Sequence, residues 1–254
     1  LFTGDLAGFR HADTLRVARS IGGLEKPAFL VPGNHDTAPL IPFLAELSGQ
    51  EILRRLSSHQ GQRFKELTAA LGPVQVGGFT RHTIGDVDLI VGRPHPMGGS
   101  ELSFRRHIEA IYDVSNLEAS ARKLKGLVDA SGDRVVFLAH NGPTGLGSSR
   151  TDIFGCDFRP EEGDWGDQDL RDAVDHARAS GRTVLAVIAG HMHHELRGGG
   201  RRTWQAEQDG VLYVNAARVP RVFHIGGARR SRSMRHHVLL TIDGDSVSAE
   251  EVLT

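Results

Sequence analysis

Four short apolar runs each lead into a loop rich in Asp, Asn and His, and this repetition constrains the fold more than any other feature. The four loops are Gly4-Asp5, Gly33-Asn34-His35-Asp36, His140-Asn141-Gly142-Pro143 and Gly190-His191-Met192-His193. Short apolar runs of this kind are typical of buried strands, and ligand sites in open α/β sheets lie outside the carboxyl ends of the strands. We therefore predict an α/β protein in which the four loops meet at one edge of a sheet.

The residue types in these loops favour a bound metal over an ordinary turn. Asn34 offers a neutral oxygen, His35 can ligate a metal or transfer a proton, and Asp36 can fix an imidazole tautomer. A single histidine is usually a surface residue or a satisfied core residue, but four loops of one pattern do not fit that explanation. Imidazole together with carboxylate and amide oxygen suits Mn, Fe, Zn or Co better than Ca.

The order of the motifs, GD, GNHD, HNGP and GHxH, resembles that of the calcineurin-like metallophosphoesterases. The resemblance implies an α/β fold, namely a four-layer α-β-β-α sandwich of two mixed sheets flanked by helices. It also implies that residues 1–254 form a single domain. Residues 138–147, 163–170 and 214–221 are similar to an uncharacterised branch of the superfamily from cyanobacteria and plant plastids.

The resemblance further implies a phosphatase or phosphodiesterase that uses two divalent metal ions and a metal-bound hydroxide. Two ions that share a hydroxide also neutralise the charge that develops on phosphorus. The implied metal ligands are Asp5, which bridges the ions, Asn34, His140 and His191 on one ion, and His193 on the other. His35 is implied as the acid that protonates the leaving oxygen, and Asp36 as the group that orients it.

The sequence departs from the family pattern at its start. Members of the superfamily begin with an Asp-x-His loop upstream of GD, whereas only residues 1–4 precede Asp5 here. Gly8 stands where many relatives carry a second Asp. We expect the sequence to be truncated at its N-terminus and to lack the first strand of the fold.

Three segments border the expected site. Arg93 and His95 follow the strand predicted at 84–91, and we expect them to contact a substrate phosphate, although a proline-rich surface loop explains them nearly as well. Residues 145–167 form a long loop rich in Gly and Asp, which predicts a lid or specificity loop. The helix predicted at 51–71 is expected to be structural, with a wall of the substrate pocket as its alternative role.

The remaining patterns predict ordinary elements of an α/β domain. Helices are expected at 13–21, at 115–130 with a capping box of Ser115 and Glu118, and at 169–179 with Asp167 as its cap. Strands are expected at 211–215 and in two hairpins, 74–79 with 84–91 and 238–242 with 246–253.

Composition narrows the partners and the compartment. The formal net charge is −1, so the chain as a whole does not attract nucleic acid or anionic lipid, and no apolar run is long enough to span a membrane. The Arg-rich stretch 228–237 leaves nucleic-acid binding as a minor option. Cys156 is the only cysteine, which favours a reducing compartment such as the cytoplasm, with a plastid or exported form left open. We expect a small phosphorylated substrate.

Two other functions fit parts of the sequence. A non-catalytic binding module that keeps this fold usually loses its acid or its ligands, whereas His35, Asn34 and three later histidines are present. A zinc amidase would use only the pair His191 and His193, and the accompanying GNHD motif argues against it.

Overall fold

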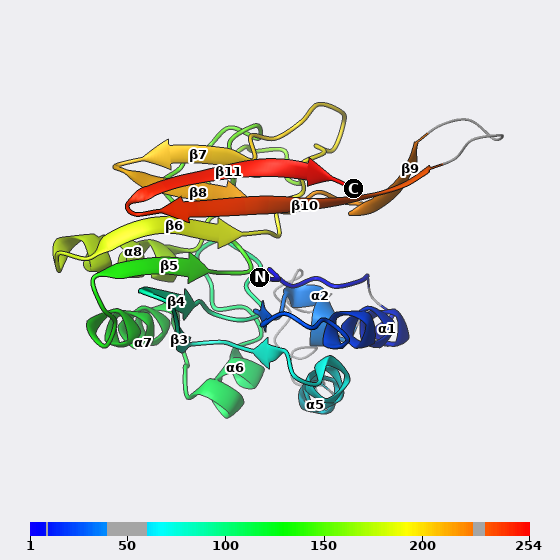
Figure 1. Cartoon of the computed structure of the whole chain (residues 1–254), viewed down its shortest axis with the longest axis horizontal. Coiled ribbons are helices and arrows are strands. Elements are labelled where there is room, and N and C mark those ends of the chain that lie inside the picture. The colour runs from blue at the N-terminus through cyan, green and yellow to red at the C-terminus, as the bar shows by residue number, and fades with distance from the viewer. Residues whose placement is uncertain (9, 40–59, 226–231) are drawn as a thin grey trace.

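The structure is a computed structural model, and it describes residues 1–8, 10–39, 60–225 and 232–254. Its centre is a six-stranded mixed sheet with the strand order β3-β4-β5-β6-β8-β7 (Figure 1). The strands are β3 (Thr80–Ile84), β4 (Val87–Val91), β5 (Arg134–Leu138), β6 (Thr183–Ala189), β8 (Val211–Asn215) and β7 (Gln205–Gln208). Strands β4, β5, β6 and β8 are parallel to one another, and β3 and β7 join them antiparallel at the two edges.

Two helices cover one face of this sheet. Helices α7 (Leu117–Asp129) and α8 (Gln168–Ala179) pack against each other and bury Leu124, Val128 and Val174 in the main core with Phe137 of β5. Helix α6 (Arg105–Tyr112) adds Ile108 to the same core. The buried central strands consist almost wholly of apolar residues because both of their faces are covered.

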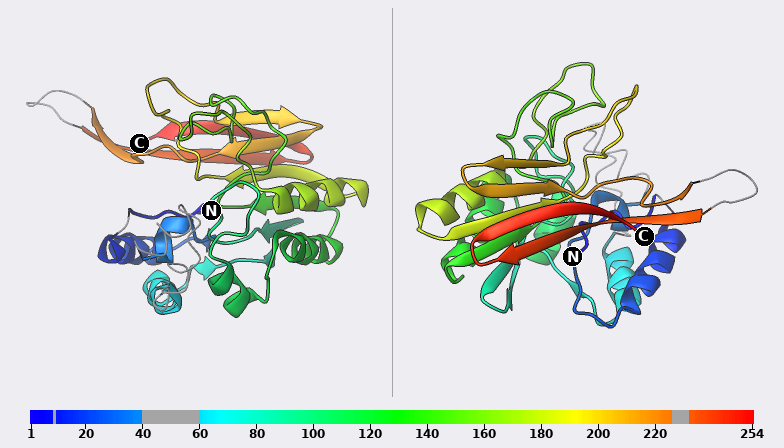
Figure 2. Two further views of the ribbon diagram at one scale, coloured as in Figure 1. Left: turned by 180° about the vertical axis from the view of Figure 1, so that it is seen from behind. Right: turned by 45° about the horizontal axis from the view of Figure 1, so that its top comes forward.

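A second sheet covers the opposite face. It contains β9 (Val222–Ile225), β10 (Arg232–Asp243) and β11 (Ser246–Leu253), and the last two form a hairpin in which Asp243 pairs with Ser246. Figure 2 shows β10 and β11 beside β6 and β8. Leu240 and Val247 pack against the cluster that includes Leu185 and Ile188 of β6. The α/β architecture of packed sheets flanked by helices is thereby confirmed, although the described strands divide among three sheets rather than two.

The third sheet belongs to the N-terminal part of the chain. Strand β1 (Phe29–Leu30) pairs in parallel with β2 (Gln75–Val76), and Phe2 adds a parallel bridge to Leu30. Helices α1 (His11–Gly22) and α5 (Gln60–Leu71) pack together there, and the short helix α2 (Asn34–Thr37) begins inside the GNHD motif. Their side chains form a separate core whose members include Ala18, Ile21, Leu30, Leu67 and Leu71.

Some element boundaries differ from the predicted ones. The first hairpin joins 80–84 to 87–91, and β2 within the predicted strand 74–79 pairs with β1 instead. Helix α7 is capped by Asn116, whose side chain accepts the N–H of Ala119, and not by Ser115. Helix α5 covers only 60–71 of the predicted helix, and the part at 51–59 lies outside the described residues. Among the described helices, none has the length and apolar character needed to cross a membrane.

Candidate metal centre

The loops after the first two apolar runs touch at two glycines. Gly4 has φ +83°, and a Cβ added there would lie 2.3 Å from the backbone nitrogen of Gly33. A Cβ on Gly33 would in turn lie 2.2 Å from Oδ1 of Asp5 and 2.6 Å from the ring of His140. Only glycine fits at such a close approach, so these residues allow three motif loops to meet.

His140 lies at the centre of the meeting point and is fully buried. Its Nδ1 lies 2.6 Å from the carbonyl oxygen of Thr3, which can only accept, so Nδ1 carries the proton. In the neutral ring Nε2 is then an acceptor, yet it faces Oδ1 of Asn34 at 2.8 Å, Nδ1 of His191 at 3.2 Å and Oδ2 of Asp5 at 3.5 Å. A cation among these four electron-pair donors satisfies them all, which is the arrangement of a metal site.

The donor set fits a transition metal of the predicted kind. One potential ligand atom each from Asp5, His140 and His191 lies within 4.8 Å of the others. Burial, followed by the nearness of His140, lowers the pKa of His191 to about 3, so this imidazole is neutral and has a free electron pair at neutral pH. Burial alone would raise the pKa of Asp5, but the neighbouring His140, His35 and His191 outweigh it and keep the carboxylate ionised.

Asp36 holds two motif loops together. Its carboxylate accepts the backbone N–H groups of Gly33 at 2.7 Å, Leu6 at 2.8 Å and Asp5 at 2.9 Å. It therefore fastens the GNHD loop to the GD loop, and its role in orienting the ring of His35 stays a prediction. Burial and the charge of Asp5 raise the pKa of Asp36 to about 6.

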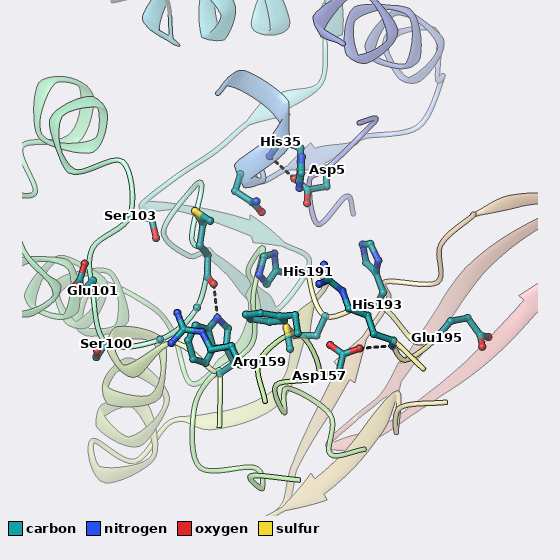
Figure 3. A pocket seen from close by; sticks show the side chains of 18 residues that line it. Asp5, His35, Ser100, Glu101, Ser103, Asp157, Arg159, His191, His193 and Glu195 are labelled. Carbon is teal, nitrogen blue, oxygen red and sulfur yellow. Dashed lines mark hydrogen bonds between the residues drawn. The ribbon is translucent and has the colours of Figure 1, made fainter. Parts of the chain in front are cut away.

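His35 and His193 both line the pocket beside the cluster (Figure 3). The backbone N–H of His35 donates to Oδ1 of Asp5 at 2.8 Å, which fixes the start of α2 against the metal cluster. The side chain of His193 is exposed, but neighbouring residues partly desolvate its ring and lower its pKa. The ring is therefore also available as a neutral ligand. The adjacent His194 is buried and donates Nε2–H to the carbonyl oxygen of Asn215 at 2.7 Å.

Arg93 and His95 lie beneath the pocket rather than in it, which corrects the expectation that they contact substrate. Arg93 is 4% exposed, and its Nε and Nη2 donate to Asp169 at 2.7 Å and Asp167 at 3.0 Å. His95 is fully buried with Nδ1 2.7 Å from the carbonyl oxygen of Gly33. Both side chains hold loops of the site in place through these contacts, whereas Nη1 of Arg93 and Nε2 of His95 have no hydrogen-bond partner among the described residues.

The pocket in front of the cluster has a volume of about 620 Å³. One wall comes from residues 97–103, and another from residues 157–165 of the loop predicted to be a lid or specificity loop. The predicted lid or specificity loop contains Phe158 and Trp165, but no sequence pattern singles out the pocket residues Met97, Glu101, Asp157 and Arg159. Aromatic residues within a long Gly-rich loop were the available signal.

Comparison with known protein families agrees with the resemblance that the four motif loops indicate. The sequence model of the calcineurin-like phosphoesterases matches residues 1–195. The chain belongs to the calcineurin-like phosphoesterase family. Its strand-end motifs Asp5, Asn34, His140 and His191 all fall inside the matched region.

Other comparisons are more distant. No curated protein matches the chain. Among solved structures, one match is Thermus thermophilus sulfate thiohydrolase SoxB in complex with glycerol, at 12% identity and a TM-score of 0.37. The alignment covers 94% of this chain and 42% of that one, so this chain spans less than half the length of that protein.

Proposed function

We propose that this calcineurin-like chain is a dinuclear metal-dependent phosphoester hydrolase, a phosphatase or phosphodiesterase. The observation that carries the proposal is the convergence of Asp5, Asn34 and His191 on Nε2 of His140, where the first three also line an open pocket. Transition-metal ions bound there supply a nucleophile at neutral pH and neutralise charge on the phosphoryl group.

The residues of the chain divide the remaining work. Asp5, Asn34, His140 and His191 would hold one ion, and His193 together with Asp5 would contribute to the other. The Nδ1–H of His140 donates to Thr3, and this hydrogen bond fixes the ring with Nε2 toward the site. His35 lies at the pocket wall and donates a proton to the leaving oxygen. General acid catalysis requires the acid to lie within hydrogen-bond reach of that oxygen.

A small phosphorylated molecule fits the size and exposure of the pocket. The walls combine apolar surface from Met97, Phe158 and Trp165 with polar groups at the rim. Ligand pockets of this kind bury the body of a ligand on apolar side chains and orient it with a few polar ones.

The test is hydrolysis of para-nitrophenyl phosphate and bis(para-nitrophenyl) phosphate with Mn, Fe, Zn or Co supplied in turn. We expect turnover that depends on the added metal, is lost in His140→Ala, and persists in His237→Ala, where the exposed histidine lies on β10. Hydrolysis of anilides but not of these esters would support the amidase alternative. Metal binding without turnover of any ester would support a non-catalytic module.

A further inference from the structure

The loop at 157–165 presents an arginine to the pocket in a geometry suited to an anion. The guanidinium of Arg159 lies over the ring of Trp165, with Cζ 4.3 Å from the ring centroid. A stacked guanidinium uses its flat face for the cation–π contact, and the N–H groups around its edge stay available for hydrogen bonds in its plane. The contact therefore holds Arg159 over the ring, and no hydrogen bond among the described residues occupies its N–H groups.

The platform under Arg159 is held firmly. Nε1 of Trp165 donates to the carbonyl oxygen of Met97 at 2.8 Å, and its backbone oxygen accepts the side-chain amide of Asn141 at 2.9 Å. Phe158 packs edge-on against the ring with centroids 5.2 Å apart. Gly98 has φ +74°, and a Cβ there would lie 2.2 Å from the ring, so glycine is needed to admit Trp165. Because Asn141 follows His140, the platform is connected directly to the metal loop.

Asp157, two residues before Arg159 and also in the pocket lining, is engaged elsewhere. Asp157 lies 3.1 Å from the buried guanidinium of Arg202 and accepts the backbone N–H of Arg197 at 2.9 Å. Across the described residues, no carboxylate forms an ion pair with Arg159, which is itself exposed at the pocket wall. An arginine that is oriented but has no carboxylate partner is prepared to bind an anionic ligand.

Arg159 also lies apart from the metal cluster. Figure 3 shows Asp5 and His35 at one end of the pocket and Arg159 at the other, beyond His191. A phosphoryl group at the metal ions would thus leave Arg159 to a second part of the same molecule. Arg159 and the backbone of Gly98 and Gly99 surround the Trp165 ring, which disfavours stacking of a substrate ring on it.

We propose that Arg159, supported by Trp165, determines specificity for phosphoesters whose leaving group carries a second anionic group, a carboxylate or a further phosphate. The proposal rests on the proposed function in assigning the phosphoryl group to the metal end. Arg forms bidentate contacts with both kinds of anion, so one residue accounts for the whole class.

Binding experiments and turnover experiments test the proposed role of Arg159 separately. The probes are ω-carboxyalkylphosphonates of increasing chain length and alkylphosphonates of matching length, titrated by calorimetry into the metal-loaded protein. We expect the carboxylated series to bind about tenfold more tightly at its best length, since a charge-assisted pair is worth about one such factor. Arg159→Gln should abolish the difference. Arg122→Gln, an exposed residue paired with Glu118 on α7, should retain it.

The turnover arm compares para-nitrophenyl phosphate with the analogue that bears an additional ring carboxylate. Arg159→Gln should raise KM about tenfold for the carboxylated ester alone, with kcat nearly unchanged for both. Equal binding of the two phosphonate series to the wild-type protein, or a difference that survives in Arg159→Gln, would overturn the proposal. If no ester is hydrolysed, the proposed function fails, and the phosphonate titrations still decide the role of Arg159.

Discussion

The buried arrangement of one guanidinium between two carboxylates gives a sharp prediction about stability. Arg93 donates to Asp169 through Nε at 2.7 Å and to Asp167 through Nη2 at 3.0 Å, and all three side chains are at most 4% exposed. Asp169 has the closer contact and also accepts the hydroxyl of Ser120. One cation can neutralise only one carboxylate, so burial raises the pKa of Asp167 to about 7 despite the nearby Arg93.

The sign of the pH dependence follows from that raised pKa. Below about pH 4 Asp167 is protonated in both the folded and the unfolded chain, so its ionisation does not lower the free energy of unfolding. Between pH 4 and pH 7 the unfolded chain loses the proton first, so the contribution of Asp167 to the free energy of unfolding falls as the pH rises. Over the interval from pH 5 to pH 8 the loss amounts to about 3 kcal/mol, because the raised pKa lies about two units above pH 5 and each unit is worth about 1.4 kcal/mol.

Asp167→Asn removes this titration while keeping an oxygen that can accept from Arg93. Urea unfolding should therefore show the variant gaining about 3 kcal/mol relative to wild type between pH 5 and pH 8. Asp169→Asn should instead cost about 3–5 kcal/mol at both pH values, because it breaks the closer buried pair. Asp13→Asn, in an exposed pair with Arg16, is the control and should change little. A pH-independent loss in Asp167→Asn as large as that in Asp169→Asn would refute the reasoning.

Three further predictions concern the site and its support. His35→Ala should slow hydrolysis of alkyl phosphates by about 10²–10⁴-fold while metal content stays unchanged, and the loss should shrink for nitrophenyl esters, whose leaving group needs no proton; equal losses would remove His35 from the acid role. Asp5→Ala should lower bound metal at both sites and abolish activity, as measured by elemental analysis; full metal content would place Asp5 outside the centre. Gly142→Ala should destabilise the protein by about 1–3 kcal/mol, because its Cβ would lie 2.0 Å from the ring of Phe154, whereas Gly126→Ala on α7, with open space around it, should not; similar melting temperatures for both variants would contradict this.

Much of the central fold can be predicted because local sequence determines it. The runs at 135–139 and 184–189 are apolar throughout, and they become β5 and β6 with both faces buried. Strand β7 has no such signal, since Gln205–Gln208 is polar and becomes a strand only by pairing with β8. Helix α6 also lacks a sequence signal, because the residues that flank it, Phe104 and Asp113, adopt the left-handed conformation although neither is glycine.

The candidate metal centre could likewise be predicted from the sequence only in part. The strand-end motifs indicate which loops meet, and the structure brings Asp5, Asn34, His140 and His191 together. Whether a polar side chain faces the pocket or supports it from beneath depends on partners that are distant in sequence. Arg93 is a buried support because Asp169, 76 residues away, lies beside it, and no pattern around Arg93 shows this.

Anomalous diffraction from crystals of the Mn- or Zn-loaded protein tests the central claim most directly. The account predicts a peak bound by Nε2 of His140, Nδ1 of His191 and oxygens of Asp5 and Asn34, with zinc–nitrogen distances of about 2.0–2.1 Å. A metal peak that Nε2 of His140 does not coordinate would contradict the account. So would a Zn-saturated crystal in which Nε2 of His140 still hydrogen-bonds to Asn34.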